Sequence, residues 1–356
     1  MATRTVHLNQ SVARRIASIM WFPVLFAIAL PVIFQLAFHA PDPHEVPVGV
    51  VGSADRVQLV RQELTDISSA GFRVQRLRTH AAISGVRGRE LAAAYVAGPR
   101  PVLYVARAAS AIRANYLVSV FATVAKEIGS PPPATVDLVP LLPGDSGAGV
   151  FFFVFPMMMV GVITVIVLLQ RAGSWTMGER MFAVAGAGAV GAATAYLTAT
   201  NLNVLPEKPV LLLVAFLLSL IFGELFVGAA PLLKQYFLPL ALAFALVVGT
   251  PSAGATITPD LLPTGLRYLS DVLPMAQGVK VTRDVAYFDG AGAGLPTLIL
   301  LLWAAVAALV VGAAWYRQAN RRSVSAAAAI DPVRAGAALQ SPTGLLTPAG
   351  ALTAPS

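Results

Sequence analysis

Residues 209–249 read PVLLLVAFLLSLIFGELFVGAAPLLKQYFLPLALAFALVVG and contain only two charged side chains, Glu224 and Lys234. A helix needs about 20 apolar residues to cross the hydrocarbon core of a bilayer, so this run is long enough for two crossings. Lys234 separates the two halves and leaves room for only a very short loop. The stretch therefore predicts an antiparallel pair of membrane-spanning helices with Lys234 at the turn.

The composition of the whole chain indicates a protein built largely inside a membrane. Of its 356 residues, 57% are apolar and 12% are charged, and a soluble domain usually has roughly 25% charged residues. This excludes a simple cytosolic enzyme. The net charge of +8 is dispersed, and many basic residues flank apolar runs, where they set topology. We therefore predict no nucleic-acid partner. Cysteine is absent, which excludes disulfides and cysteine-based metal sites.

Four further uncharged runs are long enough to span a membrane. They lie between Arg15 and Asp42, at residues 147–169, between Arg180 and Glu207, and between Asp289 and Arg317. The first run exceeds the 7–15 apolar residues of a signal peptide, so we predict a retained anchor helix at 16–39 rather than a cleaved leader. The predicted fold class is a polytopic α-helical membrane protein with six transmembrane helices, five of them in a membrane domain at 147–317.

Basic residues are unevenly distributed over the short loops and predict the orientation. Short cytoplasmic loops carry an excess of Lys and Arg. With the N-terminus inside, ten basic residues are cytoplasmic: Arg4, Arg14, Arg15, Arg171, Arg180, Lys234, Arg317, Arg321, Arg322 and Arg334. We therefore predict a multi-pass protein of the cytoplasmic membrane with both termini in the cytoplasm.

Residues 40–146 have the charge of an ordinary soluble surface and lie outside the cell in this topology. Apolar or alternating runs predict strands at 46–51, 72–77, 92–96, 102–106 and 135–141, with helices at 54–69, after Thr79 and at 108–128. This alternation predicts a small extracytoplasmic α/β domain. After the last span, residues 318–356 form a tail. From Ser323 onwards it is mostly small residues with two charges, and we predict it to be disordered.

Residues 256–289 are punctuated by three prolines and carry an apolar helical face between them. Here the sequence resembles the permease subunits of type-2 ABC transporters, whose last outer segment forms two short re-entrant helices. The family pattern is Leu-Pro-x-x-Leu-x-x-Leu-x-x-x-x-Pro, and it is matched by Leu262, Pro263, Leu266, Leu269 and Pro274. The family order of one span, a large outer domain and five spans also matches, and YhgE/Pip-like membrane proteins share it. An ordinary proline-rich surface loop is the alternative interpretation.

This resemblance implies a permease subunit of a bacterial exporter that moves a hydrophobic or amphipathic substrate across the lipid bilayer. It implies a homodimer or a sister permease as partner, together with a cytoplasmic ATPase subunit that holds ATP. No Walker A loop is present in this chain, so we predict that it is not an enzyme and has no cofactor of its own. An ATP-independent envelope scaffold or receptor-like protein is the alternative function.

In the resembling family, the loop between the second and third spans contacts the ATPase. The corresponding residues here are Ser174, Trp175, Thr176, Glu179 and Arg180. Thr176 and Glu179 fit the family pattern loosely and Trp175 does not, so a short capped turn is an equally open reading. An interfacial helix at residues 8–19 is a further expectation, with a basic flank of the first span as its alternative.

Glu224 is the only acidic residue well inside a predicted span. Burying an ionised carboxylate at the centre of a membrane costs at least ~2.5 kcal/mol on insertion scales. We therefore expect Glu224 to face the helix bundle, a dimer interface or water. It is a candidate proton carrier, which makes a proton-coupled transporter the second alternative function. A structural hydrogen bond, for example to Ser219 or Tyr236, is the other interpretation.

Overall fold

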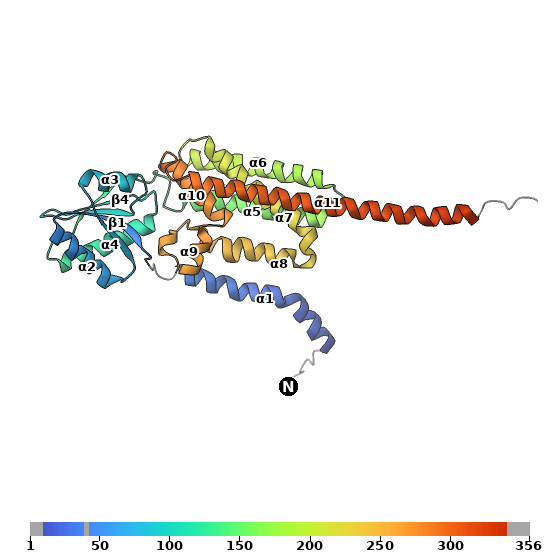
Figure 1. The fold of residues 1–356 in the computed structure, drawn as a ribbon, viewed down its shortest axis with the longest axis horizontal. Helices are drawn as coiled ribbons and strands as arrows, with labels where there is room; N and C mark the ends of the chain where they lie inside the picture. The colour runs from blue at the N-terminus through green and yellow to red at the C-terminus, as the bar shows by residue number, and fades with distance from the viewer. Residues whose placement is uncertain (1–9, 39–42, 340–356) are drawn as a thin grey trace, which may run out of the picture.

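The computed structural model describes residues 10–38 and 43–339, with the side chains of residues 20–38 and 43–320. A long helical body carries a small α/β domain at one end, and the last described turns of the C-terminal helix project from the opposite end (Figure 1). Five helical stretches are long and apolar enough to cross a membrane: Met20–Phe38, Gly149–Arg171, Met177–Asn201, Val210–Gly249 and Gly294–Asn320. The chain therefore has the make-up of a polytopic membrane protein.

The α/β domain consists of a five-stranded sheet with helices on both faces (Figure 1). Its elements follow in the order β1 (Val46–Val51), α2 (Ala54–Ile67), β2 (Phe72–Arg76), α3 (Thr79–Arg87), β3 (Ala93–Val96), β4 (Val102–Val105), α4 (Ala111–Glu127) and β5 (Ala134–Asp137). The strand order is β2-β1-β3-β4-β5, and only the β3–β4 pair is antiparallel. The predicted alternation of strands and helices is confirmed, although the last strand is shorter than expected.

The strands have the pattern that their places in the sheet require. β1 lies in the interior of the sheet and is a continuous apolar run, since both of its faces are covered. Val48 and Val50 belong to the core under α2 and α4, whereas a side chain at Gly49 would meet Ala82 of α3. β2 is an edge strand and alternates apolar and polar residues.

Helix α7 (Val210–Leu233) is the centre of the helical body. It packs against α5 (Gly149–Arg171), α6 (Met177–Asn201), α10 (Pro274–Tyr287) and α11 (Gly294–Leu339). Glycines allow the close approach: a Cβ on Gly228 would lie 2.7 Å from the backbone nitrogen of Val311, and one on Gly161 would lie 2.8 Å from that of Gly223. Such small residues let helix backbones approach closely. Close packing matters inside a membrane because the hydrophobic effect does not drive helices together in lipid.

The chain turns sharply at Lys234, whose φ of 53° and ψ of −122° end α7. A short 3₁₀ turn, helix α8 (Phe237–Leu242) and a π-helix η2 (Ala243–Gly249) then run back along α7 (Figure 1). The Phe226 ring lies 6.0 Å from that of Phe237 and 6.3 Å from that of Phe244. The predicted turn at Lys234 is thus confirmed. Six spans are predicted from the sequence, whereas the structure has five apolar stretches of sufficient length, one of which, Val210–Gly249, contains the turn at Lys234.

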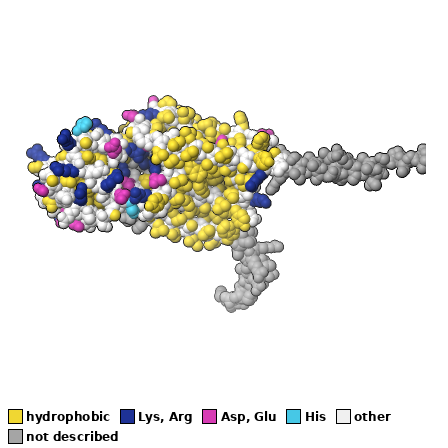
Figure 2. All heavy atoms as spheres, viewed as in Figure 1, with side chains coloured by type: hydrophobic (Ala, Val, Ile, Leu, Met, Phe, Trp, Pro, Cys, Tyr) yellow, Lys and Arg dark blue, Asp and Glu magenta, His cyan; other side chains and the backbone are white. Residues whose placement is uncertain are grey.

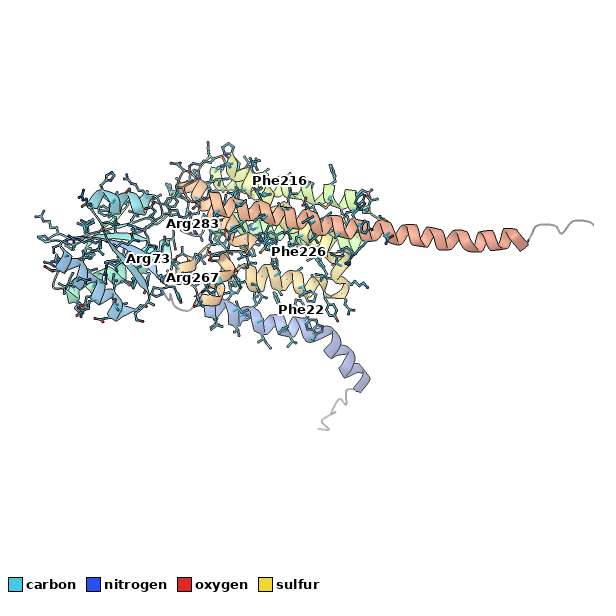
Figure 3. The ribbon with its side chains drawn as sticks, in the orientation of Figure 1. Phe22, Arg73, Phe216, Phe226, Arg267 and Arg283 are labelled. Atoms are coloured by element: carbon cyan, nitrogen blue, oxygen red, sulfur yellow. The ribbon has the colours of Figure 1, made fainter. Side chains whose placement is uncertain are left out.

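Both ends of the helical body differ from the sequence prediction. Helix α1 (Gln10–Phe38) begins before the predicted anchor at 16–39 and includes most of the expected interfacial helix, of which residues 8 and 9 lie outside the described part. It bends near Phe22 (Figure 3), beside Pro23, which lacks the amide hydrogen of a normal helix residue. The disorder expected from Ser323 is wrong as far as Leu339, because α11 continues to that residue. Alanine, abundant there, has the highest helix propensity.

The segment at 256–289 forms helices rather than a surface loop. After a 3₁₀ turn, η4 (Pro259–Leu261), come α9 (Thr264–Ser270) and α10, with Pro263 and Pro274 at their starts. Proline is favoured there because the first amide groups of a helix have no partner within it. Helix α10 is buried along most of its length, including the polar side chains of Gln277, Thr282, Arg283 and Asp284.

Candidate functional site

Six charged side chains lie where the α/β domain meets the helical body, and we term them the charged junction: Arg89, Arg113, Asp145, Asp260, Arg283 and Asp284. In Figure 2, basic and acidic side chains gather at this boundary, next to the apolar surface of the helices. Arg283 and Asp284 belong to α10, Arg89 and Arg113 to the α/β domain. The junction therefore links the buried helix α10 to the α/β domain.

Arg89 and Asp284 form an ion pair between the two parts of the molecule. The Asp284 side chain is almost fully buried at 2% exposed, and that of Arg89 is 24% exposed. The guanidinium also lies over the ring of Phe288, 5.3 Å from its centroid, a favourable cation–π geometry. Burial and the neighbouring Arg113 lower the pKa of Arg89 to about 10, so the group remains charged at neutral pH.

Arg113 and Asp260 form a second ion pair, from α4 to η4, with 2.8 Å between Nη1 and Oδ2. Burial alone would raise the pKa of Asp260, but the Arg113 guanidinium and its hydrogen bond outweigh burial and lower that pKa below its usual value. The carboxylate is therefore ionised at neutral pH. It stabilises the folded state above the pKa of an unfolded aspartate, about 3.9.

Acidification should remove this contribution. In the wild type, we expect the free energy of unfolding to fall as the pH drops below about 4 and through the lowered pKa of Asp260. Arg113→Gln leaves a largely buried, unpaired carboxylate and should cost about 2 kcal/mol at pH 7. Because burial then raises the pKa of Asp260, the difference in the free energy of unfolding between the variant and the wild type should decrease from pH 7 to pH 4. Thermal unfolding across this pH range measures both effects, and a gap independent of pH would contradict the assignment.

Arg283 is buried at 4% exposed and has no carboxylate in ion-pair contact among the described residues. Its guanidinium donates to the backbone carbonyl of Ala255 at 2.9 Å and to that of Gly254 at 3.4 Å. These carbonyls follow the 3₁₀ turn η3 (Pro251–Ala253), whose end is marked by the left-handed Gly254. The guanidinium thus satisfies two buried carbonyl groups with charge-assisted hydrogen bonds. Burial, then Arg89 and Arg113, lower the pKa of Arg283 to about 9, so it is charged at neutral pH.

Asp145 joins the start of α5 to the end of α10. Its Oδ1 accepts hydrogen bonds from the backbone amides of Gly147 and Gly149, both at 2.8 Å. The Tyr287 hydroxyl donates to its Oδ2 at 2.8 Å. Burial and the adjacent carboxylate raise the pKa of Tyr287 far above its usual value, which keeps the hydroxyl protonated as a donor.

Four residues near the junction have a left-handed backbone conformation. Glu45, Arg89, Asn203 and Asp289 have φ between 49° and 66°, a left-handed region that costs side-chain-bearing residues free energy. Glu45 precedes β1, Asn203 and Asp289 follow α6 and α10, and Arg89 lies between α3 and β3 of the α/β domain, while Lys234 (φ 53°) has the same conformation at the opposite end of the body. Arg89 thus takes a strained backbone conformation at the residue whose side chain reaches Asp284.

The predicted ATPase-contact residues form a short capped turn between α5 and α6. Thr176 and Glu179 make a capping box: the Thr176 amide donates to Oε2 of Glu179 at 2.6 Å and the Glu179 amide donates to Oγ1 of Thr176 at 3.3 Å. Arg180 donates to the Ala172 carbonyl at 3.1 Å. Ser174 and Trp175 are exposed, the latter at 44%. Local structure thus accounts for three of the five residues, and the two exposed ones are available to a partner.

Glu224 is half-buried on α7, and within the described part of the chain its carboxylate has no hydrogen bond or ion pair. The suggested partner Ser219 has a buried hydroxyl without a partner among those residues. The hydroxyls of Thr194 and Thr200 on the neighbouring helix α6 do not donate to Glu224 either, because each donates to a carbonyl of its own helix. The structure therefore does not bring Glu224 into the charged junction or into the suggested structural hydrogen bond.

The charged junction was not predicted as a site, because its members come from positions far apart in the chain. No local sequence pattern marks Asp145, Asp260, Arg283 or Asp284 as parts of one cluster. The Leu-Pro motif of residues 262–274 lies close by: its Leu262 is buried in the core shared by the α/β domain and η4. Comparison of the chain with protein-family models, curated proteins and solved structures finds no match.

Proposed function

We propose that this protein is the permease subunit of an exporter that moves a hydrophobic or amphipathic substrate across the bacterial cytoplasmic membrane. A separate ATPase chain on the cytoplasmic side would supply the energy. The observation that carries the proposal is the bonding of α10 to the outer domain through the charged junction, while α10 also packs on α5, α7 and α11. A shift of the spanning helices would thus be transmitted directly to the domain at the exit.

The proposed topology has six crossings, with α7 and the run from α8 through η2 counted separately. Its support is the position of the charges. The turn at Lys234 and the α5–α6 turn with Arg171 and Arg180 lie at the end of the body opposite the α/β domain (Figure 1). That end would be cytoplasmic by the excess of basic residues in inside loops. The α/β domain and the start of α10 would then lie on the outer side.

The arrangement of α9 and α10 supports the resemblance to type-2 ABC permeases. Two short helices separated by Pro274 follow the matched Leu-Pro motif, and α10 is enclosed by three spanning helices. We propose that α9 and α10 enter the outer half of the membrane and return without crossing it. Irregular backbone at such depth is tolerated where it is buried in protein.

Affinity purification of the tagged protein in mild detergent, followed by mass spectrometry, tests the proposal. We expect a stoichiometric ATPase subunit with the wild type. Changing the exposed pair together, Ser174→Gly with Trp175→Ser, should reduce its recovery at least about ten-fold, as expected for loss of an aromatic anchor at an interface. These positions leave the Thr176–Glu179 capping box intact.

Two controls separate contact from folding. Trp315→Ser removes another exposed tryptophan, 64% exposed on α11, and should leave the ATPase bound. Thr176→Ala removes the helix cap at a cost of about 1 kcal/mol and should lower thermal stability while retaining the partner. If no ATPase co-purifies under conditions where a known transporter keeps its own, the exporter proposal fails. The ATP-independent envelope scaffold is then favoured.

A further inference from the structure

An apolar groove of about 360 Å³ lies between α1, the π-helix η2 and the start of α9. Its walls include Ile33 and Leu36 of α1, Val247 and Val248 of η2, and Leu266 and Leu269 of α9. These side chains are aliphatic and offer no hydrogen bond to a ligand. The groove therefore suits a hydrocarbon chain.

The wall formed by α1 is loosely held. Within the apolar part of α1, Met20–Phe38, only 6% of the most apolar segment is buried in the protein. The helix packs mainly against η2 and η3. The opposite wall is formed by a π-helix, an irregular turn that occurs often at functional sites. The groove can therefore admit a chain from the side of the bilayer without disrupting the packing around α7.

Two arginines lie at the level of α9 where this groove meets the α/β domain, and both are labelled in Figure 3. Arg267 follows Leu266 directly on α9, and Arg73 is the second residue of the edge strand β2. The register pairs Arg73 with Pro47 of β1. Just before β1, the His44 amide donates to the Asp260 carbonyl at 2.9 Å, which brings this end of the sheet to the start of α9.

Neither guanidinium has a hydrogen bond or ion pair with any residue in the described part of the chain. The three arginines of the charged junction, in contrast, are all bonded to protein groups. Next to Arg267, Tyr268 is 69% exposed and Val272 is 57% exposed. An exposed tyrosine beside apolar side chains is typical of the boundary between membrane and water. Arg267 and Arg73 are thus unpaired cations within the described part of the chain, and the proposed topology puts them near the lipid head groups.

We propose that this groove binds an anionic lipid of the outer leaflet. One acyl chain lies between α1, η2 and α9, and the negatively charged head group contacts Arg267 and Arg73. The inference rests on the proposed function for the orientation of the membrane, and it names the class of amphipathic molecule held beside the exit. The apolar walls and the two unpaired cations together favour a lipid over a soluble anion or a neutral chain.

Photo-cross-linking of the full-length protein in phosphatidylcholine vesicles tests this. The vesicles contain a small fraction of either phosphatidylglycerol or phosphatidylcholine with a photoreactive acyl chain, and peptides spanning α9 and η2 are analysed by mass spectrometry. A basic residue near an anionic surface contributes about a five-fold preference. We expect labelling by phosphatidylglycerol to exceed that by phosphatidylcholine by about five-fold or more. Arg267→Gln should reduce it about five-fold and leave phosphatidylcholine labelling unchanged.

Matched variants make the outcome specific. Leu266→Trp fills the groove and should reduce labelling by both lipids, whereas Leu309→Trp, on the exposed side of α11 at 72% exposed, should not. Arg87→Gln, an exposed arginine at the end of α3, should also have no effect. Equal labelling by both lipids, or labelling insensitive to Arg267→Gln in a variant that purifies and unfolds like the wild type, overturns the proposal. Competition by excess soluble glycerol phosphate would instead assign the arginines to a soluble anion and also overturn it.

The two proposals fail separately. Absence of an ATPase partner leaves the lipid labelling unaffected, because no partner is needed for it. Absence of lipid preference leaves the recovery of an ATPase unaffected, since the groove lies at the end of the body opposite the α5–α6 turn.

Discussion

Arg283→Met should lower the free energy of unfolding by about 3 kcal/mol, because it leaves two buried carbonyl groups without a donor. Methionine keeps the apolar stem of arginine but lacks the volume of the guanidinium, so the expected loss combines the two missing hydrogen bonds with the space that this group occupied. The affected carbonyls, those of Gly254 and Ala255, connect α10 to the run that returns from Lys234. We expect this connection to loosen, and thermal unfolding in detergent or nanodiscs measures the change.

Two further variants interpret that result. Arg283→Lys keeps the charge, but an ammonium lacks the planar fork with which the guanidinium reaches both carbonyls, so only part of the stability should return. Arg87→Met removes an exposed arginine of α3 and should change the free energy of unfolding by less than about 0.5 kcal/mol. If Arg283→Met unfolds like the wild type, the buried guanidinium does not hold α10 in place.

Local patterns made much of the fold predictable. The strand at 46–51 is a continuous apolar run because β1 is covered on both faces, and the strand at 72–76 alternates because β2 is at the edge. The turn at Lys234 follows from the length of the uncharged run alone. The Thr176–Glu179 capping box is also local, with its two residues three positions apart. Each of these features depends on neighbours in the sequence.

The charged junction could not be predicted in this way. Arg89 and Asp284 are 195 positions apart, and nothing near either residue identifies the other. A charge beside an apolar run has the same appearance whether it faces solvent or pairs inside the protein. The continuation of α11 to Leu339 differs from the prediction for another reason: low charge and many small residues are typical of disorder, but alanine also favours helix.

The Arg89–Asp284 pair should respond asymmetrically to the loss of each partner. Arg89→Met leaves a carboxylate that is 2% exposed without a counter-charge, and breaking a buried pair in this way costs about 3–5 kcal/mol. Asp284→Asn leaves an arginine that is 24% exposed and still lies over Phe288, so we expect a smaller loss, about 1–2 kcal/mol. A double-mutant cycle by thermal or denaturant unfolding should give less than the sum of the two losses.

Arg89→Gly distinguishes the contribution of the Arg89 side chain to stability from the cost of its strained backbone. Arg89 has a φ of 66°, a conformation that glycine adopts at no steric cost, so this variant loses the ion pair but relieves the strain. It should therefore be more stable than Arg89→Met by about 1 kcal/mol. In an Asp284→Asn background, where no ion pair is left to lose, Arg89→Gly should be neutral or stabilising. If both Arg89 variants match the wild type while Asp284→Asn is strongly destabilised, Asp284 stabilises packing around α10 and not the connection to the α/β domain. We expect stability to increase in the order Arg89→Met, Arg89→Gly, wild type. This order is expected only if the side chain of Arg89 stabilises the protein by joining the α/β domain to α10 in spite of the strain in its backbone.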